Sequence, residues 1–132
     1  MARTFSICFT FFVFILVSIK GASADGKKLF IENKCNKCHS VKSEGIEPLP
    51  SSLKEKKEIK DLSDVGIQRD AEWLKKYQKK EIANEEGKKH KEKWKGTDED
   101  LEQIVNWLIT LKTKIDEAEI KKWYDELRQK AK

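Results

Sequence analysis

The sequence contains few of the residues that usually bind metals or bridge chain segments. Its 132 residues include one methionine, two histidines, three cysteines and two prolines. The methionine is Met1, which lies in a segment that processing removes, so the mature chain offers no thioether ligand. We also find no nucleophile with a base at suitable spacing, no paired carboxylate motif and no phosphate loop. An enzyme is therefore not expected.

The first 24 residues have the features of a secretory signal. Arg3 gives a positive start, and residues 5–19 are uncharged and mostly apolar. The Ala-Ser-Ala sequence at residues 22–24 is typical of a cleavage site. The apolar run is shorter than the roughly 20 residues of a membrane-spanning helix. An uncleaved anchor is the alternative, but Lys20 and the cleavage site favour a signal. We therefore expect a periplasmic or otherwise exported protein with no stable membrane span after cleavage.

The charge of the mature chain is nearly balanced. Residues 25–132 carry 26 basic and 23 acidic side chains, a net charge of +3. The two signs are mixed along the chain, which is typical of solvated helix faces rather than of a nucleic-acid surface. We expect no nucleic-acid partner. A chain of this length forms one small domain with a marginal hydrophobic core. An additional covalent or metal-mediated link would raise the stability of such a domain.

The apolar spacing predicts helices and no convincing strand. Helices are predicted for residues 26–38, 69–82, 97–111 and 116–132, and loop chemistry for residues 40–60. The helix that begins at Thr97 has the strongest signals, because three acidic residues follow the predicted N-cap and apolar residues then recur at helical spacing. The last helix carries an apolar stripe that either packs on its own domain or docks a partner.

The most informative motif is Cys-x-x-Cys-His at Cys35, Cys38 and His39. Two cysteines at this spacing can form thioethers with the two vinyl groups of one haem, and the next histidine can bind its iron. A thioredoxin-like pair would need a strand before the helix. A zinc site needs four ligands, and the available set is the three motif residues with His90. Cys38 and His39 are adjacent in sequence, so they could not easily both face one tetrahedral ion. A simple disulfide gives His39 no role. The third cysteine, Cys8, lies within the predicted signal.

The chain resembles the small mono-haem c-type cytochromes of the class I fold over residues 25–112. Residues 25–30 resemble the first helix of that family, where a glycine and an aromatic residue pack on the final core helix. Residues 101–108 resemble that final helix, with Trp107 at its aromatic position. Residues 62–66 and the following Trp-Leu helix resemble the middle region of the family.

The resemblance implies an all-α cytochrome c fold of four to five helices around one covalently bound haem c and its iron. It predicts a signal at residues 1–24, a cytochrome c domain at 25–112 and an extra C-terminal helical extension at 113–132. Family members often orient the proximal histidine through a proline carbonyl. Pro48 and Pro50 are candidates for this role, or both are ordinary turn prolines.

The sixth ligand departs from the family pattern. Family members usually supply a methionine before the final helix, and here His90 stands near that position. We expect His39 as the proximal ligand and His90 as the distal ligand. The alternative is that His90 is a surface histidine, which would leave the iron five-coordinate or bound by a lysine.

Bis-histidine ligation predicts a low-potential one-electron carrier that meets redox partner proteins through small, transient contacts. Without His90 as a ligand, the protein would be a gas-binding or sensor haem protein. A third candidate is a haem subunit of a periplasmic redox complex, or an oligomer, joined through residues 116–132.

Overall fold

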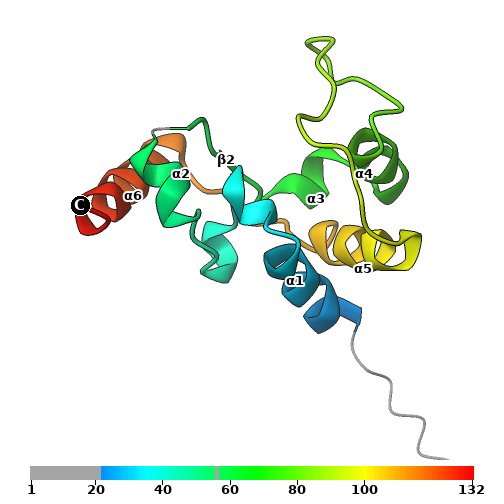
Figure 1. Cartoon of the computed structure of the whole chain (residues 1–132), viewed down its shortest axis with the longest axis horizontal. Helices are drawn as coiled ribbons and strands as arrows, with labels where there is room; N and C mark the ends of the chain where they lie inside the picture. The colour runs from blue at the N-terminus through cyan, green and yellow to red at the C-terminus, as the bar shows by residue number, and fades with distance from the viewer. Residues whose placement is uncertain (1–21, 56) are drawn as a thin grey trace, which may run out of the picture.

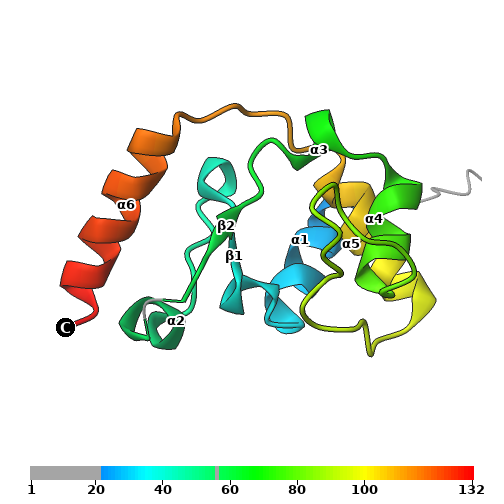
Figure 2. The same ribbon diagram turned by 90° about the horizontal axis from the view of Figure 1, so that it is seen from above.

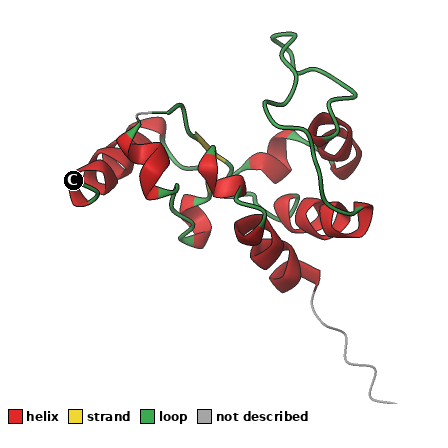
Figure 3. Ribbon diagram, viewed as in Figure 1, coloured by secondary structure: helices red, strands yellow, loops and turns green. Residues whose placement is uncertain are grey.

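The computed structural model describes residues 22–55 and 57–132. Within these residues it is mostly helical, as the all-α prediction expected (Figures 1 and 3). Residues 1–21 of the predicted signal lie outside the described residues, and residues 22–24 form the start of the first helix. The elements, in chain order, are α1 Ala22–Glu32, η1 Cys35–Lys37, β1 His39–Ser40, η2 Lys42–Glu44, α2 Pro50–Lys54, β2 Lys60–Asp61, α3 Val65–Gln68, α4 Ala71–Gln78, α5 Asp98–Leu108 and α6 Glu117–Lys130.

No helix in the described ranges combines the length and the apolar character that crossing a membrane would require.

The core is built on the contact between α1 and α5. Gly26 allows the two helices to approach closely, because a Cβ atom at this position would lie 2.3 Å from the Gln103 carbonyl oxygen and 2.5 Å from Trp107 Cβ. One turn later, the ring of Phe30 packs edge-on against Trp107, with 5.3 Å between the ring centres. The predicted packing of a glycine and an aromatic residue on the final core helix is therefore present.

The start of α5 agrees with its sequence signals. The Thr97 hydroxyl accepts a hydrogen bond from the Asp100 amide at 3.1 Å, which satisfies one of the free donors at the helix start. Acidic residues occupy the first turn, where the helix dipole favours negative charge. The apolar face of α5 is buried and contributes Leu101, Ile104, Val105, Trp107 and Leu108 to the core.

The prediction of one helix over residues 26–38 was wrong beyond Glu32. The Asn33 amide makes the last regular helical bond, to the Leu29 carbonyl at 2.9 Å, and the next amide, that of Lys34, instead donates three residues back to the Ile31 carbonyl at 2.9 Å, which ends α1. Lys34 then adopts a left-handed conformation with φ of 56°. The cysteine motif therefore begins in a separate 3-10 turn, η1, rather than in a continuous helix.

A short parallel sheet was also missed. β1 pairs with β2, with His39 opposite Lys60 and Ser40 opposite Asp61. Two-residue strands are too short to show the alternation that identifies a strand from sequence. Through this pairing the two ends of the loop that joins β1 and β2 lie side by side.

The second predicted helix is shorter in the structure. Asp70 is the N-cap of α4, and its carboxylate accepts from the Trp73 amide at 2.8 Å. After α4 the chain forms a long irregular loop at residues 79–97, on the same side of the molecule as α4 (Figures 1 and 2). The Trp94 amide donates to the Gln78 carbonyl at 2.9 Å, which brings the end of this loop back to α4.

The C-terminal helix α6 begins as predicted, with Asp116 as its N-cap. It lies beside α2, at the opposite end of the molecule from α4 (Figure 2). Tyr124 and Leu127 of its apolar stripe are buried. Of the two uses expected for this stripe, the structure shows packing on the same chain.

Candidate functional site

Cys35 and Cys38 lie at the start and just after the end of the tight turn η1. The Cys38 amide donates to the Cys35 carbonyl at 3.2 Å, and both side chains are half-buried free thiols. The proline-containing loop supports this turn, because the Leu49 amide donates to the Asn36 carbonyl at 3.0 Å and the Ser52 hydroxyl donates to the Lys37 carbonyl at 2.7 Å. The turn is therefore fixed from outside the motif.

Burial is the main reason why the pKa of Cys35 is raised to about 11. Redox-active Cys-x-x-Cys pairs have the opposite property, since their attacking thiol has a lowered pKa. The environment of Cys35 therefore disfavours the thioredoxin-like alternative.

His39 is held by the β1–β2 pairing. Its Nδ1 atom lies 3.3 Å from the Lys60 carbonyl oxygen, and because a carbonyl only accepts, Nδ1 carries the proton. The second ring nitrogen, Nε2, is then free to bind a metal. Of the two alternatives for Pro48 and Pro50, the orienting role has no support, because the carbonyl at Nδ1 is that of Lys60. Pro50 instead begins α2, where its fixed backbone angle and missing N–H suit the first turn of a helix.

His39 is neutral at physiological pH. Burial of the ring, together with the nearby His90 ring, lowers the pKa of His39 to about 4. A neutral imidazole is the form that binds metals. The protonation state and the orientation of His39 thus both suit a metal ligand.

His90 lies in the loop at residues 79–97, and its ring is oriented in a similar way. Its Nδ1 atom lies 2.5 Å from the Glu92 carbonyl, so Nδ1 donates and Nε2 keeps a lone pair. The side-chain amide nitrogen of Gln78 lies 3.3 Å from that Nε2 atom. The Tyr77 ring packs edge-on against His90, with 5.3 Å between the ring centres.

The rings of the two histidines, which are 51 positions apart in sequence, lie close together. Their ring centres are 6.0 Å apart and their planes differ by 21°. An imidazole–metal bond is about 2.0–2.1 Å long, so two imidazoles on opposite sides of one ion have ring centres roughly 6 Å apart. The spacing and the two carbonyl contacts at Nδ1 are compatible with a haem iron held between His39 and His90.

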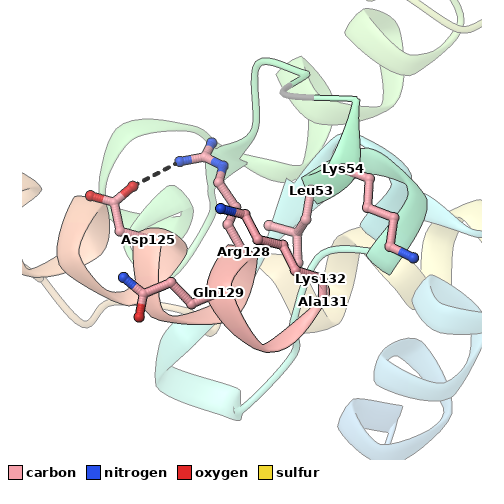
Figure 4. Close-up of a pocket in the computed structure, with 7 residues that line it drawn as sticks. All are labelled: Leu53, Lys54, Asp125, Arg128, Gln129, Ala131 and Lys132. Carbon is pink, nitrogen blue, oxygen red and sulfur yellow. Dashed lines mark hydrogen bonds and ion pairs between the residues drawn. The ribbon is translucent and has the colours of Figure 1, made fainter.

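The four-ligand zinc alternative has no support in the geometry. Among residues 22–55 and 57–132, no three His, Cys, Asp or Glu side chains are grouped so that they could hold a metal ion. A pocket elsewhere lies between α2 and α6, where Leu53 and Lys54 face Arg128 and its neighbours (Figure 4). None of the predicted site residues lines it.

Sequence reasoning missed three groups around the histidines: the Lys60 carbonyl, the Tyr77 ring and the Gln78 amide. The Lys60 carbonyl has no sequence signal, because every residue carries this group. Tyr77 and Gln78 end α4, and only the return of the loop at residues 79–97 brings His90 to them.

Comparison with known proteins gave one family. The cytochrome c family model matches residues 23–112, which include every predicted site residue and end before α6. Neither curated proteins nor solved structures gave a match. Because the matched segment covers well over half of the sequence, the chain belongs to the cytochrome c family, whose members carry covalently attached haem c and transfer electrons.

Proposed function

We propose that this chain is an exported mono-haem cytochrome that carries single electrons at low potential. Cys35 and Cys38 would hold the haem through thioether bonds, and His39 and His90 would be its two axial ligands. The observation that carries this proposal is the pairing of the two imidazole rings, 6.0 Å apart and 21° from parallel, each with Nδ1 held by a backbone carbonyl.

The carbonyl contacts support both the ligand set and the low potential. A carbonyl that accepts from Nδ1–H fixes the tautomer and makes the imidazole a better electron donor through Nε2. The bound iron supplies the one-electron chemistry by cycling between ferric and ferrous states. Two such imidazoles favour the ferric state, and methionine opposite histidine raises the potential. The residues of this chain would therefore stabilise oxidised haem.

The contact between Gln78 and His90 is part of this proposal. The amide of Gln78 donates to the same nitrogen, Nε2, that would bind iron. Metal binding at Nε2 would replace this hydrogen bond and release the Gln78 amide. Without metal, the lone pair at Nε2 is occupied by the Gln78 amide of α4.

Export and transient partners complete the proposal. The signal features of residues 1–24 support export. The lysines around His90 support docking of acidic redox partners, because their side chains are exposed: Lys88, Lys89, Lys91, Lys93 and Lys95. Charge-steered encounters of this kind weaken as the salt concentration rises.

The test is a comparison of His90→Met, His90→Ala and the matched neighbour Lys91→Ala with the wild type. We expect the wild type and Lys91→Ala to share a low-spin, six-coordinate ferric spectrum. His90→Ala should lose the sixth ligand, and His90→Met should raise the midpoint potential.

Carbon monoxide separates the carrier from a gas-binding protein. The reduced wild type should bind it slowly or not at all, because His90 must leave first, and reduced His90→Ala should bind it at once. If all variants and the wild type showed the same axial ligand field, His90 would not be a ligand and the proposed bis-histidine carrier would be wrong.

A further inference from the structure

A chain of hydrogen bonds connects the C-terminal helix to the strand that carries His39. The Tyr124 hydroxyl of α6 lies 2.6 Å from Ser40 Oγ, and Ser40 Oγ donates to Asp61 Oδ2 at 2.7 Å. A serine hydroxyl has one proton, which here goes to the carboxylate, so Tyr124 is the donor to Ser40. Ser40 is 0% exposed and Tyr124 8% exposed, so water does not compete strongly for these bonds.

The Asp61 carboxylate is fixed on both of its oxygens. The Lys42 amide donates to Oδ2 and the Ser63 amide donates to Oδ1, each at 2.9 Å. A second contact joins α6 to the same region, since Glu119 forms an ion pair with the Lys42 side chain. The helix is therefore attached to β1 and to the turn that follows it, and it reaches β2 only through Ser40 and Asp61.

This network lies directly beside the contact that orients His39. In the β1–β2 register, Ser40 pairs with Asp61 and the preceding pair is His39 with Lys60. The side-chain hydrogen bond between Ser40 and Asp61 thus stabilises one of the two residue pairs of this sheet. The other residue pair places His39 Nδ1 3.3 Å from the Lys60 carbonyl oxygen. Few backbone hydrogen bonds join strands this short, among them those from the Lys60 amide to the Cys38 carbonyl and from the Leu62 amide to the Ser40 carbonyl, so each side-chain bond is a large part of what holds the register.

We propose that Tyr124 is a positioning residue for His39 and that α6, through it, tunes the haem potential. Without the Tyr124 hydroxyl, Ser40 loses a buried donor and the β1–β2 register loosens. The Nδ1–H to Lys60 carbonyl bond then lengthens, the imidazole becomes a weaker donor, and ferric iron is less stabilised. This inference rests on the proposed ligation by His39 and does not depend on His90.

The test is a potentiometric titration of Tyr124→Phe, which removes only the hydroxyl. Leu127→Ala is the matched control, because it removes buried packing from the same helix and leaves the hydrogen-bond chain intact. We expect the midpoint potential of Tyr124→Phe to lie above that of the wild type. At any fixed potential the ratio of ferric to ferrous protein should fall at least threefold, which corresponds to a rise of about 28 mV, since a tenfold change is 59 mV for one electron. Leu127→Ala should lower the denaturation midpoint and leave the potential within error of the wild type.

A second variant makes the test independent of Tyr124 alone. Ser40→Ala breaks the same chain of hydrogen bonds, so it should raise the midpoint potential as well. The double variant, with Tyr124→Phe and Ser40→Ala together, should raise the potential by less than the sum of the two single shifts. An unchanged potential in Tyr124→Phe, or an equal shift in Leu127→Ala, would overturn the inference while the proposed function stands. Wild-type protein without covalent haem would refute the proposed function and this inference together.

Discussion

Gly26→Ala tests the contact on which the fold is built. The added methyl carbon would lie 2.3 Å from the Gln103 carbonyl oxygen and 2.5 Å from Trp107 Cβ. Normal contact requires about 3.5 Å, so α1 would have to move away from α5 by about 1 Å. Neither neighbouring atom is the end of a flexible side chain, so local adjustment cannot remove the overlap.

The expected magnitude follows from two opposing effects. In a helix interior, alanine is favoured over glycine by about 1 kcal/mol. Overpacking of a core contact costs about 1–3 kcal/mol, and the rigid atoms at Gly26 place the cost at the upper end. The net loss in free energy of unfolding should be about 2 kcal/mol. For a domain of this size, that loss lowers the urea midpoint by about 1 M.

The assay is equilibrium unfolding in urea, followed by helix circular dichroism, with Lys28→Ala as the control. Lys28 lies on the exposed face of the same helix and should change the free energy by no more than about 0.5 kcal/mol. If Gly26→Ala were as stable as the wild type or more stable, helix propensity would outweigh the contact, and the close approach of α1 and α5 would not be required for the fold.

Three further predictions each follow from one local feature of the structure. Thr97→Ala removes the cap of α5 and should cost about 1 kcal/mol in urea unfolding, whereas Thr97→Ser should retain most of that stability. Pro50→Ala should leave the midpoint potential unchanged, because the Lys60 carbonyl and not a proline orients His39. Burial raises the pKa of Tyr124, so above about pH 10 the unfolded chain loses the phenolic proton first and stability falls. Denaturation midpoints measured up to about pH 11 should show a smaller fall in Tyr124→Phe than in the wild type.

Local signals explain what could be predicted from the sequence. The cap and apolar spacing of α5 lie within the helix itself, and Asp116 begins α6 for the same reason. The Cys-x-x-Cys-His motif is contiguous, so its chemistry needs no knowledge of the fold. Gly26 and Phe30 were found because the family carries the same pair near its first helix.

Long-range backbone contacts explain what could not be predicted. The hydrogen-bond partner of His39 is the backbone carbonyl of Lys60. Every residue has such a carbonyl, and only the pairing of the two strands places this one beside His39. The end of α1 lies at Lys34, a non-glycine residue in a left-handed conformation, which no local sequence signal indicates. The prolines suggested a ligand-orienting role by analogy with the family, but the loop that contains them supports the cysteine turn instead.

The 84 positions between Ser40 and Tyr124 also set an order of events during folding. The two cysteines form one short local turn, which needs few other contacts, whereas closing a loop of this length costs entropy and occurs late. The contact from α6 therefore completes the surroundings of His39 after the cysteine turn has formed. We expect the two thiols to be accessible for haem attachment before His39 has its final support.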